Sequence, residues 1–123
     1  MIAKQPLIAK LPLIAKRRRY SGGDEQAGSF EVLDGDRSRV NGSLHFTTVS
    51  ELLTAGVEAV NNGRAAVIDL AGVTASDSSG LALLIEWLSV AKSANRALRY
   101  ENIPYQLQQL ARLSEVEDLL VPG

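Results

Sequence analysis

The sequence has no cysteine, one histidine and one tryptophan among its 123 residues. Without cysteine the chain has no disulfide, no thiolate metal ligand and no cysteine nucleophile. A single histidine, His45, makes a histidine-based zinc site or a Ser-His-Asp triad difficult to build. The phosphate-cradling pattern G-x-x-x-x-G-K-[ST] is missing as well, and no apolar run approaches the roughly 18 residues of a membrane span. These absences favour a small binding domain over an enzyme, and we expect no cofactor and no metal.

The near-zero net charge hides two oppositely charged parts of the chain. Residues 1–20 carry six Lys and Arg and no acid, whereas the other 103 residues carry seven Lys and Arg and fourteen Asp and Glu. The body of the protein is therefore at −7, which argues against nucleic acid as its ligand, because binding to phosphates requires clustered cations. A chain of this length has room for one domain.

The basic segment 1–20 is repetitive, with IAKQPL, IAKLPL and IAKRRR at a period of six residues. Pro6 and Pro12 oppose a continuous helix, and the recurring Lys opposes a secretory signal. Two interpretations are open: a tether to anionic lipid headgroups, or a disordered extension. Residues 21–28 have the composition of a flexible linker, and the folded domain is expected over residues 29–123.

Periodicity and turn residues predict alternating strands and helices in that domain. The predicted order is β-β-α-β-α-β-α(-α), which indicates an α/β (α+β mixed) fold: a small mixed sheet of about four strands with three to four helices packed on it. Strands are predicted over 29–33, 39–44, 65–70 and 97–102, and helices over 49–60, 78–94 and 105–113, with a last helical turn over 116–120.

Three finer expectations accompany this pattern. The nearly continuous apolar run 65–70 predicts a strand buried on both faces, followed by a polar loop over 71–77. Capping boxes are predicted at Thr48–Glu51 and at Ser114–Glu117, each with a glutamate reaching back to the amide of the capping residue.

The informative segment runs from Asp69 to Leu81, where a buried strand leads through a polar turn into a helix. The helix opens with Asp77, two serines and Gly80. In one interpretation this is ordinary capping, with Asp77 or Ser78 accepting from free amides and Gly80 allowing close packing. In the other, a phosphate on Ser78 or Ser79 would be stabilised by the same amides and repelled by Asp77, giving a charge switch on a binding surface.

The pattern Asp-Leu-x-x-Val-x-x-x-Asp-Ser-Ser-Gly-Leu over Asp69–Leu81 resembles the signature of STAS domains. This family comprises sulfate-transporter tails and anti-sigma factor antagonists, and the resemblance extends over about residues 29–123. It implies a small sheet flanked by helices on one side. In the antagonists, the serine directly after the motif aspartate is phosphorylated by a partner kinase, and the matching position here is Ser78.

The residues after the motif are most similar to the STAS subunits of Mla phospholipid transporters (MlaB). The resemblance rests on Gly80–Leu84, Glu86–Leu88 and the Asn102-x-Pro104 tail. It implies a non-catalytic cytoplasmic subunit on the ABC ATPase (MlaF-like), peripheral to the inner membrane, in a complex with permease and lipid-binding subunits that maintains outer-membrane lipid asymmetry.

A second apolar face on the same helix supplies a candidate partner surface. Leu83, Trp87 and Val90 lie off the core stripe of this helix, and Trp87 is a candidate hot spot, unless it packs on a neighbouring helix within the chain. The predicted partner-binding residues are Asp77, Ser78, Ser79, Gly80, Leu81, Leu83 and Trp87.

Two further functions were weighed against the transporter subunit. The first is an anti-sigma factor antagonist, which would use the same surface and be released by phosphorylation of Ser78. The second is a serine hydrolase, which is disfavoured because Asp-Ser-Ser-Gly lacks the G-x-S-x-G elbow and only His45 offers an imidazole. Asp34 and Asp36 flank a glycine, a pattern typical of a turn rather than of a metal site.

Overall fold

The computed structural model describes residues 28–120, so the basic segment, most of the predicted linker and the last three residues lie outside the described part. The predicted order of elements is confirmed. The elements are β1 (Ser29–Val32), β2 (Arg37–Leu44), α1 (Val49–Asn61), β3 (Val67–Ser76), α2 (Ser78–Ser93), β4 (Arg99–Glu101), α3 (Tyr105–Leu113) and α4 (Glu117–Leu120).

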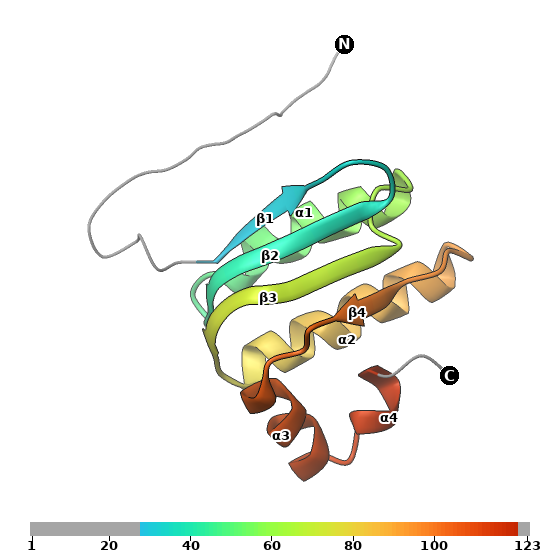
Figure 1. The fold of residues 1–123 in the computed structure, drawn as a ribbon. Coiled ribbons are helices and arrows are strands. Elements are labelled where there is room, and N and C mark those ends of the chain that lie inside the picture. Colours follow the sequence, from blue (N-terminus) through green and yellow to red (C-terminus); the bar gives the residue numbers. More distant parts are fainter. Residues whose placement is uncertain (1–27, 121–123) are drawn as a thin grey trace.

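The four strands form one mixed sheet in the order β1-β2-β3-β4. β1 pairs antiparallel with β2 through a turn at Gly35, while β2, β3 and β4 run parallel. The parallel pairs are joined by α1 and α2, which lie side by side behind the sheet in Figure 1, and α3 and α4 extend below it. The fold is thus the predicted small sheet with helices packed on it, and the helices cover one face only.

The strand β3 is longer than the sequence predicted. It continues through the expected loop 71–77 as far as Ser76, because β2 pairs with it over that whole length, from Arg37 opposite Val67 to Leu44 opposite Ser76. Register shifts along β2 let Val73 and Ser76 return to the buried side. The residues after Leu70 are less apolar, although strand pairing continues there. This loss of apolar character is why the sequence predicted a loop.

The prediction that this strand is buried on both faces holds for Val67, which lies on the side of Asp69 and is 8% exposed, but not for Asp69 itself. Ile68 and Leu70 are fully buried under the helices, but Asp69 points to the open face and is only half-buried. That face carries a polar network in which Arg37 pairs with Glu101 at 2.6 Å, and the Asn102 side-chain amide donates to Asp69 at 2.9 Å. Helices on one side of a sheet leave the other side to charged and polar residues.

Both predicted capping boxes are wrong. Thr48 is the residue before α1, but its amide donates to the carbonyl of His45 at 2.9 Å and no side-chain cap bond forms. Ser114 ends α3 instead of opening the last helix, because Glu115 has a left-handed φ of 60°, which cannot continue a right-handed helix. None of the helices within residues 28–120 has the length and apolar character that a bilayer crossing requires.

Candidate functional site

The motif lies where β2 and β3 end and α2 begins, and we call this region the motif end; it is at the left in Figure 1. The carboxyl ends of the two parallel strands meet there, and the amide of Asp77 donates to the carbonyl of Leu44 at 3.1 Å. Ser76 is held from the other side, since its amide donates to Oε1 of Gln106 on α3 at 3.1 Å. Three separate parts of the chain therefore fix the turn that starts α2.

Asp77 caps α2, as one of the two sequence interpretations predicted. Its Oδ1 accepts from the amide of Ser79 at 2.8 Å, and its Oδ2 accepts from the amide of Phe46 at 3.3 Å. Burial raises the pKa of this carboxyl, but the hydrogen bonds from Ser79 and Phe46 outweigh that effect and hold the pKa below its usual range. Asp77 is exposed and charged at neutral pH, so it places a fixed negative charge on the surface.

The two serines of the motif differ in accessibility. Ser78 is exposed and Ser79 is half-buried at the first turn of α2. Ser78 is therefore accessible next to Asp77 in the chain, whereas Ser79 gives its amide to the cap. This geometry allows binding or modification at Ser78 without any rearrangement of the helix start.

Gly80 and Leu81 lie inside the protein. A β-carbon on Gly80 would lie 2.0 Å from Oγ of Ser76 and 3.0 Å from the β-carbon of Leu44, so a side chain there would push α2 away from the strand ends. Leu81 is 5% exposed and belongs to the core. Both residues pack the motif end from inside. The accessible part of the predicted site is Asp77, Ser78 and part of Ser79.

Trp87 and Leu83 are also buried, and the prediction of an exposed second face on α2 is wrong for them. The Trp87 ring is fully buried, lies 5.4 Å edge-on from Phe30 of β1, and donates to the carbonyl of Leu53 at 3.2 Å. A β-carbon on Gly56 of α1 would collide with this ring. Trp87 therefore joins β1, α1 and α2 within one chain, which is the alternative that the sequence had left open.

A family described as "MlaB, STAS domain" matches residues 33–122, nearly three quarters of the sequence. This chain belongs to the STAS domain family. None of the curated proteins matches it.

Two solved structures share the STAS fold with this domain. The unphosphorylated anti-sigma factor antagonist SpoIIAA aligns with a TM-score of 0.60 at 15% identity, over 79% of this chain and 88% of the other. The phosphorylated form of SpoIIAA, the Bacillus cell fate determinant, aligns with a TM-score of 0.58, also at 15% identity, over 79% and 91%. At this identity the likeness establishes the fold alone.

The sequence interpretation of this STAS domain missed two aromatic residues near the motif. Phe46, in the turn between β2 and α1, is 67% exposed, and Tyr105, the first residue of α3, is 72% exposed. Phe46 is tied to Asp77 through its amide, and Tyr105 precedes the Gln106 that holds Ser76. A large apolar residue among polar neighbours was the available signal for Phe46. Its proximity to Asp77 depends on the parallel pairing of β2 with β3.

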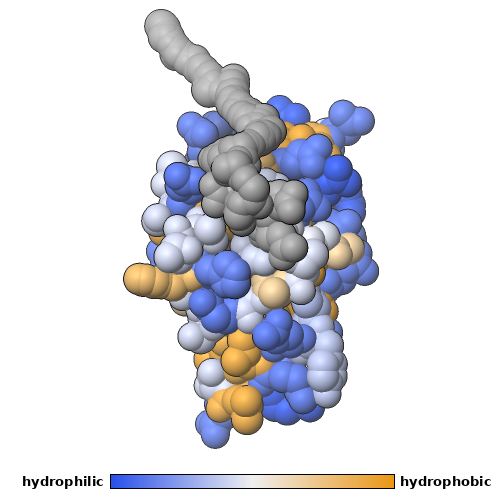
Figure 2. Space-filling model, turned by 90° about the vertical axis from the view of Figure 1, so that its left-hand side faces the viewer, coloured by the Kyte–Doolittle hydropathy of each residue, from blue (hydrophilic) through white to orange (hydrophobic). Residues whose placement is uncertain are grey.

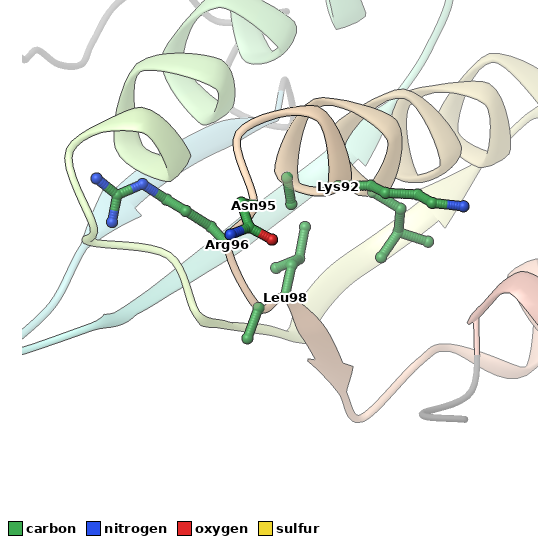
Figure 3. Close-up of a pocket in the computed structure, with 7 residues that line it drawn as sticks. Lys92, Asn95, Arg96 and Leu98 are labelled. Atoms are coloured by element: carbon green, nitrogen blue, oxygen red, sulfur yellow. The ribbon is translucent and has the colours of Figure 1, made fainter.

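The arrangements that a serine hydrolase or a metal site would need are not formed among residues 28–120. No hydrogen bond there joins the His45 side chain to Ser78 or Ser79, and no group of three acidic or histidine side chains is placed to hold a metal ion. A cavity of about 410 Å³ lies at the far end of α2, between Leu88 and Leu98. Figure 3 shows that its two cations, Lys92 and Arg96, point away from each other, so they do not converge on one ligand.

Proposed function

We propose that this protein is a non-catalytic STAS subunit that binds and supports the ATPase of an ABC phospholipid transport complex of the Mla type, which maintains outer-membrane lipid asymmetry. In this role it lies in the cytoplasm, peripheral to the inner membrane through its complex with the permease and lipid-binding subunits. The ATPase partner (MlaF-like) supplies the nucleotide chemistry, because this chain has no phosphate-binding loop.

One observation carries the proposal: the family that matches residues 33–122 is the one described by the name MlaB. The geometry agrees with a binding role. Asp77 and Ser78 are exposed on a helix start that is held by β2, β3 and α3, so the surface is rigid before a partner arrives. A preorganised surface loses little entropy on binding, which favours stable assembly with the ATPase.

A second candidate is an anti-sigma factor antagonist switched by phosphorylation of Ser78. The fold likeness to SpoIIAA and the exposure of Ser78 favour it. A phosphate on Ser78 would add about two negative charges beside the Asp77 carboxylate and change the surface from weakly to strongly acidic. Both candidates use the same surface and differ in the partner.

The deciding experiment is a pull-down of the tagged full-length chain from its native host, followed by mass spectrometry of the bound proteins. We expect an ABC ATPase together with its permease. A serine kinase in place of the ATPase would contradict the transporter role and support the antagonist. The Ser78→Glu variant sharpens the result, because a longer side chain at the exposed helix start is expected to hinder close contact and reduce recovery of the ATPase while circular dichroism stays unchanged.

Phosphorylation is tested separately on protein from the same host. Intact-mass analysis of the wild-type chain and of Ser78→Ala, with Ser79→Ala as the matched control, reports whether Ser78 carries a phosphate. For a transporter subunit we expect an unmodified mass. A phosphate that disappears only in Ser78→Ala would favour the antagonist.

A further inference from the structure

We infer that Phe46 and Tyr105 are the apolar anchors of the docking surface, and that the partner meets them with a surface that is both apolar and cationic. This inference rests on the proposed function and specifies the chemistry of the partner's contact. It comes from two observations: where the exposed aromatic residues lie, and how charge is distributed along the sheet.

The two anchors come from different elements and lie on opposite sides of the motif. The amide of Phe46 donates to Asp77, and Gln106, next to Tyr105, accepts from the neighbouring Ser76. The Phe46 backbone is thus bonded directly to Asp77, and Tyr105 is the chain neighbour of the residue whose side chain is bonded to Ser76. Figure 2 looks onto this end, where a few hydrophobic side chains lie among hydrophilic ones.

Exposed aromatic rings beside a rigid turn are suited to binding. Large aromatic residues are enriched among the few interface residues that carry most of the binding energy. The Phe46 ring is 67% exposed, and the Tyr105 hydroxyl accepts from the Gln109 side chain at 2.9 Å, which holds the second ring along α3. Within residues 28–120 they are the exposed large aromatic side chains, and both are at the motif end.

Charge is divided along the molecule in a way that specifies the partner. The segments 40–63, 65–91 and 100–111 contain no Lys or Arg, and they build the whole motif end. The cations of residues 28–120 lie at the starts of β2, β3 and β4, at the end of α2, and at the end of α3. The motif end exposes carboxylates, Asp77 and Glu51 in the first turn of α1. Such a surface attracts a cationic partner and meets no repulsion from its own residues.

The anchors are tested by measuring the affinity of the full-length chain for the recombinant ATPase subunit of the host's phospholipid transporter. We expect Phe46→Ala and Tyr105→Ala each to weaken binding about tenfold or more. The matched control is Leu113→Ala, which removes a side chain that is 82% exposed at the other end of the same helix as Tyr105. It should bind as wild type does, and urea unfolding verifies that all three variants are folded.

The charge preference is tested by a matched pair on α1. Glu51→Lys places a cation at the motif end, and Glu58→Lys makes the same change two turns further along the same helix, where Glu58 is also exposed. We expect Glu51→Lys to weaken binding several-fold and Glu58→Lys to have little effect. Wild-type binding should also weaken as salt rises from about 0.1 M to about 1 M, because the screening length falls from ~10 Å to ~3 Å.

The outcomes separate this inference from the proposed function. If the wild-type chain does not bind the ATPase, the proposed function fails and the inference fails with it. If wild type binds and both alanine variants retain its affinity, the assignment of Phe46 and Tyr105 as anchors is wrong, but the proposed function is not contradicted. Equal effects of Glu51→Lys and Glu58→Lys would overturn the cationic contact alone.

Discussion

The two ends of the sheet have opposite surface chemistry although the same strands and helices run between them. At the far end, where β2 and β4 begin, Glu101 accepts from Arg37 at 2.6 Å and from Arg99 at 3.1 Å, so its charge is neutralised within the chain. At the motif end Asp77 is satisfied by backbone amides and no described Lys or Arg faces it. In an ion pair the carboxylate's charge is neutralised by the cation. A carboxylate held only by backbone amides keeps its negative charge.

The two ends are stabilised by different kinds of contact. One end is closed by its own charges and polar contacts, with Arg64 donating to the carbonyls of Gly35 and Leu33. The other end is held equally firmly, but by contacts that leave aromatic rings and a negative charge exposed. The two ends of the same parallel strands thus differ in how much negative charge and aromatic surface they leave exposed.

The largest expected effect comes from removing Trp87, a buried side chain that lies between the two ends. Trp87→Ala deletes a fully buried ring midway along α2, together with its bond to Leu53, and we expect a loss of about 3–5 kcal/mol in the free energy of unfolding. Guanidinium unfolding of the full-length chain measures it. Trp87→Phe keeps part of the packing and should lose less. A loss below about 1 kcal/mol for the alanine variant would mean that Trp87 is not the central packing residue.

An intermediate effect is expected from the cap of α2 at the motif end. Asp77→Ala removes the acceptor for the amides of Ser79 and Phe46, and should cost about 1 kcal/mol. Asp77→Asn retains an acceptor oxygen, although it removes the surface charge, and should cost less. Urea unfolding of both variants measures the difference. If the two variants are equally destabilised, the charge and not the hydrogen bonding is what stabilises the helix start.

The smallest effect is expected at the far end and depends on pH. The hydrogen bond from Arg37 lowers the pKa of Glu101, so its contribution to stability is complete above the ordinary glutamate pKa of about 4.3 and is lost as pH falls below that value. We expect the urea midpoint to fall between about pH 5 and pH 3. In Glu101→Gln this fall should be slightly smaller. An unchanged pH profile would show that the exposed ion pair contributes nothing to stability.

Much of the fold follows from local patterns in the sequence. The order of elements, the span of α3 from Tyr105 to Leu113, and the start of α2 at Ser78 were all predicted, because turn residues and helical periodicity act over a few residues. The length of β3 was not predicted, since its outer half is held by pairing with β2 and not by apolar residues of its own. The capping box at Thr48 failed for a similar reason: the amide of Thr48 donates to the carbonyl of His45, a residue outside the predicted box.

The sequence by itself determined that the chain forms a small mixed sheet with helices, that a helix begins with a capping residue at Asp77 or Ser78, and that the motif is of the STAS type. These properties depend on residues close together in the chain. Only the tertiary structure decided which members of the motif helix are accessible: Trp87 is covered by α1 and β1, Leu83 is buried in the core, and Ser78 is exposed. Only the parallel pairing of β2 with β3 decided that Phe46 lies beside Asp77, 31 residues further along the chain. A helix with apolar residues on two faces does not reveal which neighbour covers each face, because that depends on contacts between distant segments.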